Sequence, residues 1–98
     1  MSYGYEIHPE AQKEYLKSIE WYLERSDFAT QLFIDTIKHG IAVICNDPKM
    51  FKKSKGRYHE LVLLRCPFTI VYKIDPLAEK VVIMAIYHQS RNPKLKYR

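Results

Sequence analysis

The sequence contains very little of several residue types, and each shortage excludes a class of protein. Among 98 residues there are only three glycines and two cysteines. Three glycines cannot supply the glycine-rich loops that cradle nucleotide phosphates, and Cys45 and Cys66 are too few for a disulfide framework. No run approaches the roughly 18 apolar residues that a membrane helix needs, and residues 1–7 lack the basic and apolar regions of a signal peptide. We therefore expect reduced thiols, a cytoplasmic location and no membrane partner.

The patterns that mark a nucleophile or a metal site are also missing from the sequence. The chain has no Gly-x-Ser-x-Gly motif, and its histidines are scattered at His8, His39, His59 and His88. Neither cysteine has a partner two residues away, which is the spacing typical of zinc sites. The sequence therefore predicts neither a metal nor a cofactor.

What is present is the composition of one globular domain with an uneven distribution of charge. Hydrophobic residues make up 47% of the chain and charged residues 28%, which predicts a single domain over residues 1–98. Residues 1–48 contain four Lys/Arg and eight Asp/Glu, a net charge of −4, whereas residues 49–98 contain twelve and three, a net charge of +9. This asymmetry favours a nucleic acid or an acidic protein as the partner of the second half, and solubility alone is the alternative.

Hydrophobic spacing predicts a short strand followed by a helix at the N-terminus. Tyr3, Tyr5 and Ile7 alternate with other residues, which indicates a strand with one buried face. Pro9 suits the first position of a helix, because it has no amide hydrogen to lose there. Apolar residues then recur at three- and four-residue steps over residues 11–23, as they do on one face of a helix.

A second amphipathic helix is predicted by the apolar residues between 29 and 44. Asp27 suits its N-cap, and Asn46-Asp47-Pro48 ends it because proline disfavours the helical conformation of the residue before it. Only a tight break separates the two helices, so we expect them to form an antiparallel hairpin.

The second half of the sequence predicts a basic loop over residues 49–57 and then three strands. The strand patterns cover residues 58–65, 68–75 and 80–87. Short turns between them predict antiparallel neighbours, so the fold class is α+β: an N-terminal strand, a helical hairpin and a three-stranded antiparallel meander in one sheet with the helices on one face. The sheet residues expected to pack on the helices are Leu63, Ile70, Tyr72, Ile83 and Ala85.

A basic and aromatic set lies near the ends of the predicted strands. Its members are Arg65, Tyr72, Tyr87, His88 and Arg91, and an antiparallel sheet can bring several of them together at one end. Such a cluster suits RNA cleavage, because an arginine stabilises the pentavalent phosphate and a histidine exchanges protons near neutral pH. The alternative for Tyr72 is a place in the core, and for Arg65 the neutralisation of a strand end.

Contacts to a nucleic acid or to a protein target are expected from the basic loop and the C-terminal tail. The candidate residues are Lys49, Lys52, Lys53, Lys55, Arg57, Tyr87, Lys94, Lys96 and Arg98. A solvated basic loop without a partner is the alternative interpretation.

Three stretches together resemble one known family. They are the helical hairpin that ends at Asn46-Asp47-Pro48, the arginine, turn and tyrosine-ended strand of Leu64–Ile74, and the segment Val82–Pro93 with its ending His88-Gln-Ser-Arg91-Asn-Pro93. In this order they resemble the RelE/ParE superfamily of bacterial toxins, also called plasmid stabilization proteins. The His-x-x-Arg-x-Pro ending is similar to that of ParE-like members.

The resemblance implies a growth-arresting toxin of a type II toxin–antitoxin module, bound by a small acidic antitoxin in a hetero-oligomer. ParE-like members inhibit DNA gyrase, which is the activity we favour. RelE-like members are metal-independent endoribonucleases (mRNA interferases) that act on mRNA at the ribosome, and here Arg65, His88 and Arg91 would be the catalytic residues. Gln89 stands where those members have a tyrosine, and no glutamate clearly matches their general base. An inactive member that only binds its antitoxin is the third alternative.

Overall fold

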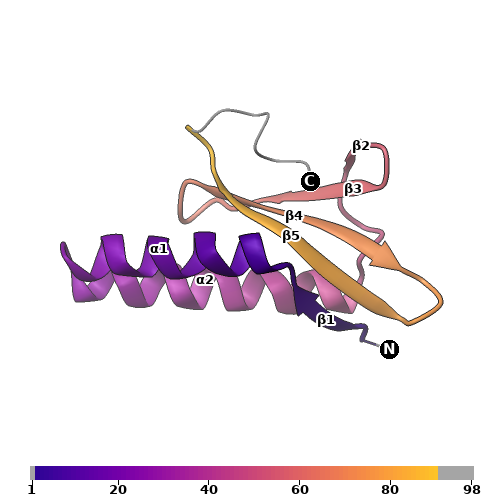
Figure 1. The fold of residues 1–98 in the computed structure, drawn as a ribbon, viewed down its shortest axis with the longest axis horizontal. Coiled ribbons are helices and arrows are strands. Elements are labelled where there is room, and N and C mark those ends of the chain that lie inside the picture. The colour runs from indigo at the N-terminus through magenta and orange to yellow at the C-terminus, as the bar shows by residue number, and fades with distance from the viewer. Residues whose placement is uncertain (1, 91–98) are drawn as a thin grey trace.

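The computed structural model describes residues 2–90, which form two helices and five strands (Figure 1). The predictions for Arg91, Lys94, Lys96 and Arg98 lie outside the described residues. In chain order the elements are β1 (Gly4–Ile7), α1 (Pro9–Leu23), α2 (Asp27–Asn46), β2 (Lys53–Lys55), β3 (Tyr58–Val62), β4 (Phe68–Asp75) and β5 (Lys80–His88).

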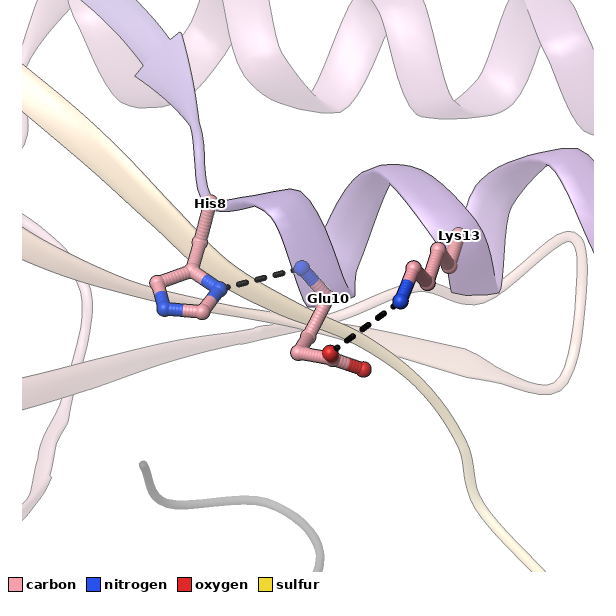
Figure 2. A network of polar contacts seen from close by, with 3 residues as sticks. All are labelled: His8, Glu10 and Lys13. Carbon is pink, nitrogen blue, oxygen red and sulfur yellow. Dashed lines mark hydrogen bonds and ion pairs between the residues drawn. The ribbon is translucent and has the colours of Figure 1, made fainter.

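The start of α1 is fixed by polar contacts over its first turn (Figure 2). Pro9 occupies the first helical turn, as predicted, and the His8 Nδ1 atom accepts a 3.1 Å hydrogen bond from the backbone N–H of Glu10. The Glu10 carboxylate in turn lies 3.5 Å from the Lys13 ammonium. An acidic residue in the first turn also complements the positive end of the helix dipole.

The N-cap of α2 is Ser26, so the prediction of Asp27 was wrong by one residue. Ser26 has an extended backbone, and its hydroxyl oxygen accepts a 3.1 Å hydrogen bond from the Ala29 N–H. Asp27 is the first helical residue instead. Serine and aspartate are about equally good N-caps, so the pattern of apolar residues cannot choose between adjacent ones.

Within residues 2–90, α2 is the helix that is long and apolar enough, by length and composition, to cross a membrane. Its place in the fold accounts for this character. Phe33, Ile37 and Ile44 on α2 are buried in the main core, where they face the sheet. The helix is therefore apolar because one side of it packs against the sheet in the main core.

The strands form one sheet in the order β1-β5-β4-β3-β2, and α1 and α2 lie side by side on one face of it (Figure 1). The meander β3–β4–β5 is antiparallel, as predicted. Two features go beyond the prediction: β1 pairs with β5 in parallel, and β2 pairs with β3 inside the segment that was predicted to be a loop. The three residues of β2 are all polar and exposed, so they carry no hydrophobic alternation that a sequence pattern could reveal.

Close approach of α2 to the sheet depends on Gly40. A Cβ atom built at this position would lie 2.9 Å from the Ile70 Cδ1 atom and 3.3 Å from a methyl carbon of Leu63. Such distances are shorter than van der Waals contact, so a side chain here would push the helix away. Ile70 itself is fully buried.

Two predicted core positions were wrong. Ala85 lies on the face of the sheet away from the helices, in a second small cluster with Val71 and Tyr87. The register of β4 on β5 shifts between Val71 and Tyr72, so the alternation of sides along the continuous apolar strand β5 breaks there. Tyr5 is 54% exposed, because β1 is the outermost strand of the sheet.

Candidate functional site

Two hollows lie at opposite ends of the β4–β5 pair, and the predicted site residues divide between them. The first is at the start of β4, where Phe68 pairs with His88. The second is at the end of β4, beside Asp75. We call the first the His88 cleft and the second the basic groove.

The His88 cleft, about 550 Å³ in volume, lies between α1 and the β3–β4 loop. Its lining residues are Lys17, Ser18, Trp21, Tyr22, Pro67, Phe68, His88 and Ser90. Most of this wall is apolar. The Phe68 and His88 rings meet edge to face with centroids 5.0 Å apart.

The imidazole of His88 is oriented by its own C-terminal neighbours. Its Nδ1 atom accepts a 3.1 Å hydrogen bond from the backbone N–H of Ser90 and lies 2.7 Å from the Ser90 hydroxyl. An Nδ1 atom that accepts leaves the proton of the neutral ring on Nε2. Gln89 connects the end of β5 to the β3–β4 loop through two hydrogen bonds. Its backbone N–H donates to the Pro67 carbonyl at 2.8 Å, and its side-chain amide donates to the Phe68 carbonyl at 3.1 Å.

Arg65 lies at the same end of the sheet as His88, as predicted, in the exposed loop between β3 and β4. Its neighbour Leu64 is 98% exposed. Cys66 in this loop offers no reactive thiolate, because burial raises the pKa of its thiol above the ordinary value.

Tyr72 and Tyr87 do not line the His88 cleft. Tyr87 precedes His88 on β5, so Arg65, Tyr87 and His88 share this end of the sheet, as predicted for several members of the set, whereas Tyr72 does not. Tyr72 is fully buried on the helix side of β4, and its hydroxyl donates a 2.6 Å hydrogen bond to the Pro48 carbonyl. Burial, reinforced by the negative charge of Asp47, raises the pKa of Tyr72 above its ordinary value. Tyr87 belongs to the small cluster on the face away from the helices. The core alternative for Tyr72 is the one that the structure supports.

The basic groove, about 810 Å³ in volume, brings together cations from three segments. Lys49, Lys53 and Arg57 come from the region predicted to be basic, and Lys73 comes from β4. The other lining residues are His59, Ile74, Asp75, Pro76, Leu77 and Val82. Lys52 and Lys55 are exposed on the same segment as Lys53. Lys73 was not predicted as a site residue, because Lys73 alternates with core residues along a strand.

His59 is the second groove residue that was not predicted from the sequence. Its ring stacks on Tyr72 with centroids 5.2 Å apart and planes 17° apart, and its Nδ1 atom lies 3.0 Å from the Phe51 carbonyl oxygen. A carbonyl only accepts, so Nδ1 carries a proton and Nε2 is the other ring nitrogen available for a contact. Within residues 2–90 no three His, Cys, Asp or Glu side chains are grouped so that they could hold a metal ion.

Comparisons with known proteins identify the family and the fold. The family model described as "ParE toxin of type II toxin-antitoxin system, parDE" matches residues 5–93. The crystal structure of the isolated E. coli RelE toxin in its P21 form is similar, with a TM-score of 0.66 and 12% sequence identity, over 95% of this chain and 90% of that chain. None of the curated protein sequences matches the chain. At 12% identity, the likeness to the solved structure concerns the fold.

Proposed function

Because the chain belongs to the ParE toxin family of type II toxin–antitoxin systems, we propose that it arrests growth by binding and inhibiting DNA gyrase. Membership also implies an antitoxin that binds and neutralises it. Its site of action would then be the cytoplasm, where gyrase works on DNA. In the RelE-like alternative the target is the ribosome instead of gyrase.

The separation of His88 from the clustered cations supports a binding function over RNA chemistry. RNA cleavage requires a proton-transferring group and a phosphate-stabilising cation within reach of one phosphodiester. His88 lies beside Phe68, where β4 begins and where Lys17 and Arg65 are the nearby cations, whereas the larger cluster of Lys73 and its neighbours lies where β4 ends. The ends of an eight-residue strand are separated by about 23 Å, at about 3.3 Å per residue. Moreover, the wall around His88 is mostly apolar, as the buried core of a protein-binding surface is.

One observation favours the alternative of ribosome-dependent mRNA cleavage. His59 lies among the cations of the basic groove, with its Nδ1 atom bonded to a carbonyl, an arrangement that orients the ring. If the protein is a nuclease, His59 is therefore a better candidate for proton transfer than His88. The third alternative, an inactive member that only binds its antitoxin, predicts neither activity.

Two purified assays distinguish these functions. The protein is incubated with gyrase and relaxed plasmid, and separately with ribosomes programmed with mRNA. We expect supercoiling to be blocked and the mRNA to remain intact. His88→Ala should still inhibit gyrase, with a loss of no more than about 1–2 kcal/mol in binding, because the imidazole provides a contact and no chemistry.

The opposite pattern would reject the gyrase proposal. Cut mRNA together with normal supercoiling would establish the nuclease alternative, and loss of cutting in His59→Gln but not in His88→Ala would locate its proton-transferring group in the basic groove. Absence of both activities would leave antitoxin binding as the function.

A further inference from the structure

The His88 cleft has the size and the lining of a small-molecule site. Its volume is about 550 Å³, and rings from three elements line it: Trp21 and Tyr22 from α1, Phe68 from β4 and His88 from β5. Ligand pockets in proteins typically measure about 300–1,000 Å³, with mainly apolar and aromatic walls and a few polar groups that orient the ligand. The cleft matches this description in both respects.

The rings of the cleft are held in place by contacts within the protein. The Trp21 and Tyr22 rings meet at 90° with centroids 5.2 Å apart, and the Phe68 and His88 rings meet at 80°. The Arg25 guanidinium lies 3.8 Å from the centre of the Trp21 ring and donates a 2.8 Å hydrogen bond to the Trp21 carbonyl. Trp21 is therefore oriented although it is 53% exposed. A ligand ring could pack edge to face against these rings at little cost in side-chain ordering.

The polar groups of the cleft select a ligand with a negative charge. Among residues 2–90 no acidic side chain lines the cleft, whereas Lys17 does. The ion pairs that the described part of the chain shows do not include Lys17. Neutral His88 carries its proton on Nε2, because its Nδ1 accepts from the Ser90 N–H. A carboxylate accepts hydrogen bonds from an ammonium and from an imidazole N–H, whereas a cationic ligand would be repelled by Lys17.

The number of charges favours a small ligand over a nucleic acid. A nucleic acid presents a row of phosphates, and its binding requires several cations along the chain. Lys17 is the cation that lines this mostly apolar hollow. One cation beside several rings complements a single negative charge attached to a ring.

We infer that the His88 cleft binds a small aromatic carboxylate, whose ring lies among Trp21, Tyr22 and Phe68 and whose carboxylate pairs with Lys17 and accepts a hydrogen bond from His88 Nε2. The ligand would occupy the apolar wall that supports the gyrase proposal. Its binding, however, requires neither gyrase nor the ribosome, so the inference does not depend on the target.

The fluorescence of Trp21 tests this inference, because Trp21 is the one tryptophan of the sequence and lines the cleft. The probe is 3-phenylpropionate, which is titrated into the purified chain while the indole is excited selectively. We expect a saturable shift of the emission to shorter wavelength, because the ligand displaces water from the indole. The dissociation constant should be about 0.1–1 mM, which suits a ligand of this size.

Three analogues separate the charge from the ring. 3-Phenylpropanamide keeps the ring without the charge and should bind about threefold to fivefold more weakly, the size of the effect of an exposed ion pair. 3-Phenylpropylamine, which carries a positive charge, should bind more weakly than the amide. Cyclohexanepropionate keeps the charge but has no aromatic ring, and it should bind about twofold or more weaker than the probe.

Two lysine variants locate the carboxylate. Lys17→Met keeps the length of the side chain without its charge, so it should weaken the affinity for 3-phenylpropionate about threefold to fivefold and leave that for the amide unchanged. Lys38→Met is the matched control, because Lys38 is exposed on α2 and does not line the cleft. An unchanged thermal midpoint verifies that each variant is folded.

Any of four results would overturn the inference. They are the absence of a saturable shift at about 10 mM probe, equal affinity for the carboxylate and the amine, equal affinity for the two carboxylates with and without an aromatic ring, and equal losses in Lys17→Met and Lys38→Met. The purified chain is used alone in every measurement. A failure here therefore leaves the proposed target untouched, and a failure of the target assays leaves this site untouched.

Discussion

The carboxylate of Glu14 on α1 accepts a 3.1 Å hydrogen bond from the backbone N–H of Ile86 on β5. β1 pairs with β5 only as far as Ile83, so Ile86 lies beyond the reach of that strand. α1 packs along β5 here (Figure 1), and its glutamate supplies the acceptor that another strand would otherwise provide. A helix side chain thus completes the hydrogen bonding of the sheet and fixes the position of α1 along it.

This contact predicts different outcomes for two substitutions of Glu14. Glu14→Gln retains an oxygen acceptor and should change the free energy of unfolding little. Glu14→Ala leaves the Ile86 N–H without its partner and should cost about 1–3 kcal/mol. Urea denaturation of both variants, with exposed Glu20→Ala as a control, measures the difference. Equal destabilisation by glutamine and alanine would mean that the negative charge, and not the acceptor, is what matters.

The hydroxyl of Tyr72 is predicted to stabilise the end of α2 through Pro48. Tyr72→Phe removes the 2.6 Å hydrogen bond and leaves the Pro48 carbonyl buried without that donor. We expect a loss of about 1–3 kcal/mol, measured as a lower denaturation midpoint with an unchanged denaturant slope. Tyr58→Phe, at a tyrosine outside the main core, provides the comparison. A Tyr72→Phe protein as stable as the wild type would show that the bond contributes nothing net.

The same phenol predicts how stability depends on alkaline pH. The pKa of Tyr72 is raised in the folded protein, first by burial and then by Asp47, above the value of 10.0 that an exposed tyrosine has. Above about pH 10 the unfolded chain loses this proton while the folded chain keeps it, so the unfolded state binds fewer protons and stability falls as pH rises. Below pH 10 the contribution is constant. In Tyr72→Phe the decline above pH 10 should be shallower, and identical slopes in both proteins would contradict the assignment.

Gly40 is predicted to be intolerant of larger side chains. Gly40→Val would place methyl groups where Ile70 and Leu63 already lie, and overpacking of this kind costs about 1–3 kcal/mol or more. Ala42→Val introduces the same residue at an exposed position of α2 and should cost only the small difference in helix propensity. Thermal unfolding of the two variants compares them directly. Equal midpoints would show that α2 can move away from the sheet without cost.

Ile37 offers a test of the interface between α2 and the sheet. It is 2% exposed, and Ile37→Ala should cost about 2–5 kcal/mol because truncation leaves a cavity in the main core. A domain of this size is only marginally stable, so a large part of the population could unfold at 37 °C. Circular dichroism during heating would reveal the lower midpoint, and an unchanged midpoint would place Ile37 outside the core.

Periodicity predicted the elements that bury one face, and it missed those that do not. The helical hairpin and the antiparallel meander follow from apolar spacing and from turns such as Asp75–Glu79. β2 could not be predicted, because the side chains of Lys53–Lys55 are all exposed and the strand is defined only by its pairing with β3. The parallel partner of β1 could not be read from local sequence, since the pairing joins residues at opposite ends of the chain.

The candidate site was predictable in composition but not in arrangement. The basic loop supplies Lys49, Lys53 and Arg57 to one groove, as its clustered charge suggested. The register of β4 on β5 puts His88 at one end of the strand pair, away from these cations. The separation could not be predicted without that register. Lys73 and His59 could not be selected, because a cation or an imidazole within a strand pattern is ordinary on either face of a sheet.

The parallel pairing of β1 with β5 has a consequence for synthesis of the toxin. In the sheet, β5 lies between β1 and β4. While residues beyond 80 have not been translated, β1 therefore has no strand to pair with and is not connected to β4. Contacts between such distant segments also form late and slowly. A toxin chain that stalls or is released before residues 80–88 have been made therefore lacks the closed sheet, and the complete fold can form only after β5 has been translated.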